Sequence, residues 1–282
     1  MRELTVLSWN LFHGRDAPPN PALRTMRSRL LRRDEHDETH VQVNRPLREE
    51  FAALIGREPW DVCLLQEAPP YWDAALARAT DAASYVALTS RNWFAPLRAR
   101  LGWWNPDLMG SWEGGSNITL VRPPWRIAGA PRSLLLNPLP GRGLHERRRM
   151  SFVRVRDEGR DLCVANLHLT AGVRRPAERE AVRAAETALR WAGEATSLIV
   201  GGDFNLRPRN TDVFERLESA YDLGAPTAPD ALDHLLARGL EVIRPPSALP
   251  VERRELEVPV GLEVRRLRLS DHAPVEATYG VR

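Results

Sequence analysis

The fold is decided by residues 198–205, LIVGGDFN, in which three apolar residues lead through two glycines to Asp203 and Asn205. A short apolar run of β-prone residues is typical of a strand buried on both faces, and folds built on such strands collect their ligands at one edge of the sheet. Residues 198–200 therefore predict a buried strand, and Asp203 and Asn205 are candidate functional residues at its end.

Four more segments share this design of an apolar run that stops at polar side chains of catalytic or ligand type. Residues 5–9 end at Asn10, residues 62–65 at Gln66 and Glu67, residues 162–165 at Asn166 and His168, and residues 267–269 at Asp271 and His272. Five strands that deliver such side chains to the same end predict a single site.

Helical patterns lie between these runs. The clearest covers residues 178–194, where apolar residues recur at helical spacing with Arg and Glu opposite them, and shorter helices fit residues 47–56 and 73–79. Further strands fit residues 85–89, 117–122, 150–155, 240–244 and 276–280. With no repeat of fixed period and no low-complexity linker, the pattern predicts one α+β domain over residues 1–282 with a large central sheet system.

Two long excursions interrupt the pattern. Residues 16–46 hold an arginine-rich segment whose apolar positions predict a short amphipathic helix followed by a loop, which either packs on the domain or meets a polyanion or a membrane. Residues 91–115 contain five aromatic residues among arginines, prolines and glycines. They fit either a loop pinned by its own aromatics or a flap that contacts the substrate.

Composition excludes several classes of protein and chemistry. The 40 basic and 37 acidic residues leave a net charge of +3, which is too small to indicate a nucleic-acid-binding protein by itself. All the basic residues are arginines, so a lysine Schiff base and a Walker-type phosphate loop are excluded. Cys63 and Cys163 each lie in an apolar run, which predicts buried core residues rather than a disulfide or zinc site.

The sequence also bears on location. No run approaches the roughly 18 to 20 consecutive apolar residues of a membrane span, and the first residues lack a charged start, an apolar segment and a cleavage site. We therefore expect a cytoplasmic protein, and nothing in the sequence requires more than a monomer.

The polar residues at the strand ends form an oxygen-rich set. Carboxylates together with amide oxygens suit a hard cation, Mg²⁺ or Mn²⁺, rather than zinc. A cation held by one or two carboxylates keeps positions open for water and for a phosphate oxygen, which is the arrangement that phosphoryl transfer needs.

The order of the motifs resembles the endonuclease/exonuclease/phosphatase family of the DNase I-like superfamily. The matching segments are LSWN at 7–10, LLQE at 64–67, ANLHL at 165–169, GGDFN at 201–205, LDHLL at 232–236 and LSDHAPV at 269–275. The resemblance spans nearly the whole chain. It implies a four-layer α/β/β/α sandwich, with two packed mixed sheets flanked by helices, and a metal-dependent phosphoester hydrolase.

The resemblance also implies residue roles. Glu67 would be the main ligand of Mg²⁺ or Mn²⁺, with Asn10 and Asp271 close to the ion. Asp203 would orient and deprotonate the attacking water, and Asn205 would hold that water or a phosphate oxygen.

The remaining implied roles concern the phosphate. His272, held by Asp233, and His168 would contact it from two sides, and both histidines would supply positive charge. Asn117, Asn166 and Arg149 are the candidate substrate contacts, although the sequence does not decide between Arg149 and its neighbours Arg147 and Arg148.

Departures from the family's patterns leave the substrate open. Ala68 and Pro69 after Glu67 lack the lysine common in exonuclease III-like enzymes, and Leu232 and Leu206 do not match inositol phosphatases. The leading hypothesis is a phosphodiesterase, either a nuclease or a phospholipid-head-group diesterase. The alternatives are a phosphomonoesterase on inositol, lipid or nucleotide phosphates, and an inactive family member that serves as a binding module.

Overall fold

The computed structural model describes all residues except 90–93, 111–113, 138–146 and 194–196. Runs rich in Val, Ile and Leu form the strands of two sheets. The six-stranded sheet has the order β12 (Glu241–Ala248), β15 (Val275–Val281), β1 (Arg2–Asn10), β4 (Val62–Ala68), β6 (Ser116–Val121) and β5 (Ala83–Leu88). The five-stranded sheet has the order β11 (Asp233–Arg238), β10 (Ser197–Asp203), β9 (Arg160–His168), β8 (Arg149–Asp157) and β7 (Arg126–Leu135).

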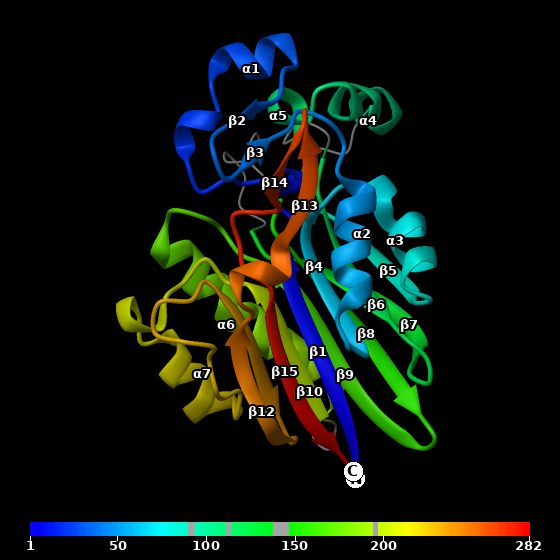
Figure 1. The fold of residues 1–282 in the computed structure, drawn as a ribbon. Coiled ribbons are helices and arrows are strands. Elements are labelled where there is room, and N and C mark those ends of the chain that lie inside the picture. The colour runs from blue at the N-terminus through cyan, green and yellow to red at the C-terminus, as the bar shows by residue number, and fades with distance from the viewer. Residues whose placement is uncertain (90–93, 111–113, 138–146, 194–196) are drawn as a thin grey trace.

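The two sheets pack face to face, and helices cover their outer faces (Figure 1). The layer between the sheets is apolar and includes Leu4, Val6, Leu64, Val164, Ile199 and Leu235. Helices α2 (Arg48–Arg57) and α3 (Asp73–Ala79) lie on the first sheet, and α6 (Arg174–Ala192) and α7 (Val213–Tyr221) lie on the second. This arrangement confirms the predicted four-layer α+β sandwich.

One parallel pair of strands lies inside each sheet, and its register decides where the polar side chains meet. In the first sheet β1 runs parallel to β4, with Asn10 beside Gln66. In the second sheet β9 runs parallel to β10, with His168 beside Asp203. Because parallel strands end at the same edge, both pairs bring their polar termini to one end of the sandwich.

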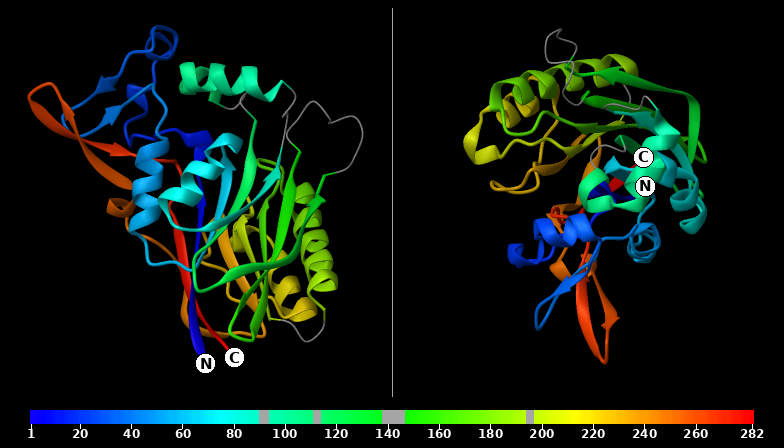
Figure 2. Two further views of the ribbon diagram at one scale, coloured as in Figure 1. Left: turned by 90° about the vertical axis from the view of Figure 1, so that its right-hand side faces the viewer. Right: turned by 90° about the horizontal axis from the view of Figure 1, so that it is seen from above.

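The smaller elements gather at that end (Figures 1 and 2). They are α1 (Met26–Leu31), β2 (Glu35–His36), β3 (Val41–Gln42), α4 (Ala95–Trp104) and α5 (Pro106–Met109), which we call the cap. Side chains hold the cap together, since Asn105 Nδ2 donates to Arg29 O at 2.8 Å and Asp107 N donates to Asn44 Oδ1 at 3.3 Å. Next to it, β13 (Glu255–Val260) and β14 (Glu263–Arg268) form a separate hairpin.

Several expectations need correction here. The loop expected for residues 91–115 contains the helices α4 and α5, while Trp93 and Trp112 lie outside the described residues. The loop expected after α1 contains the β2–β3 pair, and the run 267–269 ends the separate hairpin rather than a core strand. Local propensity misses these elements because contacts within the cap stabilise them. Both cysteines are buried and free, as predicted.

Two glycines allow the chain to reach Asp203. A Cβ on Gly201 would lie 2.5 Å from Leu235 Cδ2 and 2.8 Å from Leu64 Cδ1 of the facing sheet. Gly202 has a φ of +132°, and a Cβ there would lie 2.0 Å from Leu167 O of the neighbouring strand. Only glycine fits this closely packed backbone without displacing β9 from β10.

We therefore expect Gly202→Ala to lower the free energy of unfolding by roughly 2 to 4 kcal/mol, because it combines backbone strain with overpacking. Gly159→Ala is the matched control. Gly159 also has a positive φ, +86°, but nothing lies within 4 Å of its added Cβ, so the loss should be about 1 kcal/mol. Urea unfolding of both variants measures the difference, and equal losses would show that the contact with Leu167 does not matter.

Candidate active site

Strand pairing places three functional side chains next to one another. Asp203, the last residue of β10, pairs with His168 on β9 and with Asp233 on β11. Residues directly opposite in neighbouring strands point to the same face. The registers of β10 with its two neighbouring strands therefore bring together the imidazole of His168 and the carboxylates of Asp203 and Asp233, which are far apart in sequence.

Asp203 is almost completely buried, and fixed donors hold its carboxylate. Oδ1 accepts the backbone N–H of Asn205 at 2.9 Å, and Oδ2 accepts the amide of Asn10 at 2.9 Å. The His168 Nε2 lies 3.4 Å from Oδ2. Asn205 thus positions Asp203 through its backbone, while its own side-chain amide donates to Leu169 O at 3.1 Å.

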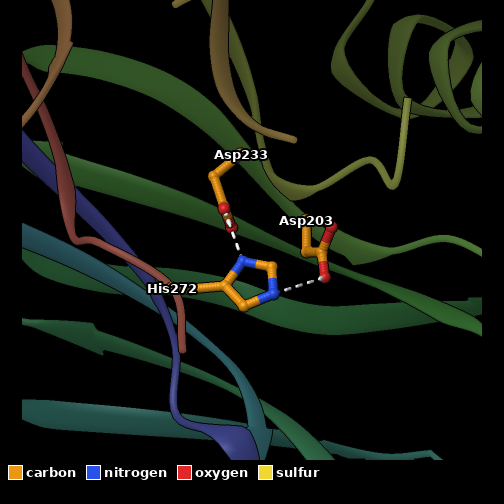
Figure 3. Close-up of side chains that lie close together, drawn as sticks. All are labelled: Asp203, Asp233 and His272. Carbon is orange, nitrogen blue, oxygen red and sulfur yellow. Dashed lines mark hydrogen bonds and ion pairs between the residues drawn. The ribbon is translucent and has the colours of Figure 1, made fainter. Parts of the chain in front are cut away.

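His272 lies between two carboxylates (Figure 3). Its Nδ1 is 2.6 Å from Asp233 Oδ2, and its Nε2 is 4.0 Å from Asp203 Oδ2. Trp9 Nε1 donates to His272 O at 2.9 Å, and Ser270 Oγ accepts the His272 backbone N–H at 3.0 Å. These bonds fix the ring with Nδ1 on Asp233 and Nε2 facing the centre of the site.

The charges of this group follow from burial and from its neighbours. Burial and the nearby Asp233 carboxylate raise the pKa of Asp203 to about 7. Burial alone would lower the pKa of His272, but the charge and hydrogen bond of Asp233 outweigh it and raise that pKa to about 10. At neutral pH His272 is therefore a cation, and Asp203 is close to its point of titration.

Glu67 faces the same centre from the other sheet. Its Oε1 lies 3.7 Å from His168 Nε2, and its Oε2 lies 3.3 Å from His13 Nε2. His13 was not predicted from the sequence; it follows β1 in a short helical turn at residues 12–14. Its position three residues after Asn10 was the available clue, because a tight turn there folds back over the strand end.

His168 differs from its expected role as a cation. Arg148 Nη1 donates to its ring, 2.6 Å from Nε2 and 2.7 Å from Nδ1. Burial, followed by the positive charge of Arg148, lowers the pKa of His168 well below its usual value. The imidazole is therefore neutral, and the positive charge on this side of the site belongs to Arg148.

Of the three neighbouring arginines, Arg148 is the one that lies against His168. The guanidinium of Arg149 donates to Ser133 Oγ at 3.1 Å, on the neighbouring strand β7. Arg147 is exposed, whereas Arg148 is buried. A run of three arginines cannot reveal which member turns toward the site, because the choice depends on where β8 begins.

Asn166 and Asn117 also lie elsewhere than expected. Both are fully buried between the sheets. Asn166 Oδ1 accepts from Gln66 Nε2 at 2.8 Å, its Nδ2 donates to Leu65 O and Ile118 O, and Asn117 Nδ2 donates to Arg149 O at 2.8 Å. These amides join the two sheets beneath the site, so the structure offers neither of them to a substrate.

Backbone strain collects at this edge. His13, Glu67, Asn205 and Ser270 have φ values of +55°, +48°, +51° and +58°. Left-handed conformations in residues other than glycine cost about 1 to 3 kcal/mol each, and they are typical of functional sites. At Glu67 the strain accompanies a register shift between β4 and β6, which turns the carboxylate toward the site.

The expected cation ligands are only partly gathered. Asn10 Oδ1 accepts the backbone N–H of Phe12 at 2.9 Å, so it could bind an ion only through its second lone pair. Asp271 is exposed, and the atoms of described residues that lie close enough to share a metal ion come from Asp203, Asp233 and His272. In that trio Asp233 already accepts the ring N–H of His272, and Asp203 Oδ2 lies 4.0 Å from the other ring nitrogen. Glu67 and Asp203 approach the same atom, His168 Nε2, at 3.7 and 3.4 Å, and carboxylates are the ligands that a hard cation prefers.

Comparison with known proteins identifies the fold and the family. The Endonuclease/Exonuclease/phosphatase family model matches residues 7–272. No curated protein sequence matches the chain. Among solved structures, a mannosyl-6-phosphatase from Bacteroides thetaiotaomicron has a TM-score of 0.65 and 16% identity, with 98% of this chain and 99% of that chain covered.

Two further structures show the same fold. The endonuclease/exonuclease/phosphatase from Beutenbergia cavernae has a TM-score of 0.64 and 17% identity, with 100% of this chain and 72% of that chain covered. The human nocturnin catalytic domain, solved with bound sulfate, has a TM-score of 0.60 and 16% identity, with 99% and 95% covered. The family match extends from the first site strand to His272. The chain therefore belongs to the endonuclease/exonuclease/phosphatase family, whose members are hydrolases that act on phosphoester bonds.

Proposed function

We propose that this chain is a phosphodiesterase that depends on Mg²⁺ or Mn²⁺. The observation that carries the proposal is the position of Asp203, a buried carboxylate held by two donors beside the cationic His272. A carboxylate aimed by fixed donors can orient and deprotonate a water, and an imidazolium beside it can neutralise a phosphate oxygen.

In the proposed reaction a water attacks phosphorus, the bond from phosphorus to the ester oxygen breaks, and Asp203 takes the proton of the water. His272 donates from Nε2 to a non-bridging phosphate oxygen, while Asp233 holds Nδ1 and favours the charged ring. Arg148 adds positive charge on the opposite side, next to His168. Asn10 and Asn205 keep the Asp203 carboxylate in one orientation.

Glu67 would be the main ligand of the cation, with Asp203, Asn10 and Asp271 near it. The cation would supply positive charge to the phosphate and to the departing oxygen. His13 would hold the second oxygen of Glu67, as it does at 3.3 Å. A metal-ligating carboxylate is oriented in this way by an outer hydrogen-bond partner.

Charge bears on the choice between a diester and a monoester. The site holds the carboxylates Glu67, Asp203 and Asp233, and the fixed cations near them include Arg148, His272 and Arg15, whose charge acts on Glu67. Because these charges nearly balance, a diester with one negative charge needs less additional positive charge from the cation than a monoester with nearly two. Monoesters still belong among the test substrates, because one structural neighbour is a mannosyl-6-phosphatase.

A substrate panel tests the proposal. It contains plasmid DNA, RNA, bis-p-nitrophenyl phosphate, p-nitrophenyl phosphate, sphingomyelin and phosphoinositides, each with Mg²⁺, with Mn²⁺ and with EDTA. We expect metal-dependent cleavage of at least one diester at a higher kcat/KM than any monoester. Higher kcat/KM on monoesters would assign a phosphomonoesterase, and no turnover on any substrate would favour a binding module.

Removal of the metal is expected to abolish turnover. The variant Glu67→Gln is expected to raise the Mg²⁺ concentration needed for half-maximal activity by about tenfold or more, because a neutral amide is a weaker ligand for a hard cation. A Mg²⁺ titration of activity measures the shift. Glu49→Gln, on the exposed surface of α2, is the matched control. Full activity after exhaustive EDTA treatment would contradict the metal dependence.

A further inference from the structure

A row of apolar side chains on α4 faces solvent. Phe94, Leu97, Leu101 and Trp104 are 69%, 60%, 36% and 53% exposed. Leu97, Leu101 and Trp104 are spaced by four and three residues, which places them on one face of α4, and Phe94 is the residue that precedes the helix. Such a stripe ordinarily points into a core, so its exposure along the whole length of α4 needs an explanation.

The adjoining helix α1 extends the same apolar surface. Its Met26, Leu30 and Leu31 are 61%, 60% and 53% exposed. Of the two alternatives that the sequence left open for this helix, packing on the domain does not account for these three side chains. The Arg32 guanidinium lies 5.2 Å from the centroid of the Trp104 ring, which joins the end of α1 to the end of α4. We call the seven apolar residues of the two helices the crest.

Arginines outnumber acidic residues around the crest, where the nearest carboxylates are Glu35, which accepts from Thr25 Oγ1 at 2.6 Å, and Asp107, whose charge acts on Arg29. Residues 21–33 contain five arginines, residues 94–106 contain two, and neither range contains Asp or Glu. On a helix, Arg98 and Arg100 fall on the two sides of the α4 stripe. Arginines that border an apolar stripe can extend their charged ends toward anionic groups while their stems cover apolar surface.

The crest lies at the same end of the molecule as the candidate active site. Figure 1 and the left view of Figure 2 place α1 and α4 at the outermost level of the cap, beyond the ends of β1 and β4. Arg15, whose charge acts on both Glu67 and Asp107, links the site to α5 of the cap. A partner that covers the crest would therefore lie over the end where Asp203 and Glu67 are found.

We propose that the crest is a docking surface for an anionic lipid bilayer. Leucine and methionine side chains with a tryptophan and a phenylalanine bury favourably at the level of lipid head groups, and the bordering arginines match acidic lipids. Five of the seven crest side chains, Met26, Leu30, Leu31, Leu97 and Leu101, have no ring on which a nucleic-acid base could stack. A second copy of the crest would oppose arginines to arginines, which disfavours a symmetric dimer.

Vesicle binding tests this surface without reference to catalysis. The full chain is sedimented with vesicles of phosphatidylcholine that contain about one-third phosphatidylserine, and with vesicles of phosphatidylcholine alone. We expect binding to the acidic vesicles, and weaker binding to the neutral ones. The triple variant Leu97→Ser, Leu101→Ser and Trp104→Ser should lose about tenfold or more in vesicle affinity, because each exposed side chain no longer enters the lipid.

Two further variants refine the test. Arg27→Gln with Arg33→Gln and Arg100→Gln should weaken binding to acidic vesicles more than to neutral ones. Val242→Ser should leave binding unchanged, because Val242 is 42% exposed on β12, where it pairs with Tyr279 near the opposite end. Circular dichroism checks that each variant is folded.

Three outcomes would overturn the proposal. The first is that the unaltered chain does not sediment with acidic vesicles, and the second is that the triple serine variant binds them as well as the unaltered chain does. The third is that the crest serves another partner. This would be shown if the unaltered chain retains duplex DNA, or forms a dimer in light scattering, and the triple variant loses that interaction but still binds vesicles. None of these readouts uses turnover, so failure here would leave the proposed phosphodiesterase activity standing.

Discussion

Asp203→Asn is expected to reduce turnover by roughly three orders of magnitude, within the 10²- to 10⁴-fold range of a positioned general base. The amide has nearly the same shape as the carboxylate but cannot accept the proton of the attacking water. Steady-state turnover on the best substrate of the panel measures the loss. Asp230→Asn, at an exposed residue paired with Arg209, is the matched control and should retain full activity.

The same variant is expected to lose turnover but to gain stability against unfolding, so a catalytic role of Asp203 can be distinguished from a structural one. The pKa of Asp203 is raised to about 7 in the folded chain, against about 4 for an unperturbed aspartate. The folded state therefore binds the proton more tightly, and stability is lost as pH rises from about 4 to 7. In EDTA, Asp203→Asn should unfold at higher denaturant than the unaltered chain at pH 8, with a smaller difference at pH 4.

These two measurements make the role of Asp203 testable. Retention of more than about a tenth of the turnover would show that another group accepts the proton. Loss of activity together with loss of stability at pH 8 would mean that Asp203 is mainly a structural residue, held by Asn10 and Asn205. The loss of stability is not expected, because burial and the neighbouring Asp233 make the Asp203 carboxylate an electrostatic cost in EDTA, even with His272 nearby.

The strand ends could be predicted from the sequence because their pattern is local. Apolar runs marked β1, β4, β9 and β10, and the polar residues that follow them are brought together by two parallel registers. Asp233 and His272 were paired only through the family resemblance. Their 2.6 Å contact depends on a strand register and on a loop anchored by Ser270, neither of which has a local signature.

The site residues that were predicted incorrectly are those whose role depends on the direction of the side chain. Asn166 follows a buried run just as Asn10 does, yet it points between the sheets while His168, two residues later, reaches the edge. A shift of one residue along a strand reverses the face, and the sequence does not give the register to that accuracy. The sequence left Arg148 undecided among three arginines and gave no prediction for His13, because both lie outside the strands, Arg148 just before β8 and His13 in a left-handed turn.

The cap shows a second limit on what can be predicted from the sequence. The sequence predicted an apolar helical face within residues 16–46, and apolar spacing ordinarily predicts burial. In the structure Leu23 of that face is buried, but Met26 and Leu30 are exposed. A hydrophobic pattern shows which residues share a face, but whether that face meets the core, a partner or a membrane depends on tertiary packing.

Asp233 and His272, thirty-nine positions apart, are expected to act as one unit. His272→Ala and Asp233→Asn should each reduce turnover by about a hundredfold, because the first removes the cation beside the phosphate and the second removes the group that keeps it charged and oriented. The double variant should be scarcely slower than the slower single variant, since residues that act together are strongly non-additive. His36→Ala, at an exposed histidine on β2, is the matched control.

The pH profile distinguishes this pairing from a merely structural contact. The Asp233 carboxylate is the main influence that raises the pKa of His272 to about 10 against the opposing effect of burial. Imidazolium should therefore persist through pH 9 in the unaltered chain, and its loss should reduce activity only above that pH. Without the charge of Asp233, burial dominates and the ring loses its proton at a lower pH. Relative to the unaltered chain at the same pH, Asp233→Asn should accordingly retain a larger fraction of the activity at pH 6 than at pH 8.5. The variant His272→Ala should lose the same fraction at both. An unchanged alkaline limb in Asp233→Asn, or multiplicative losses in the double variant, would show that His272 does not depend on Asp233 for its charge.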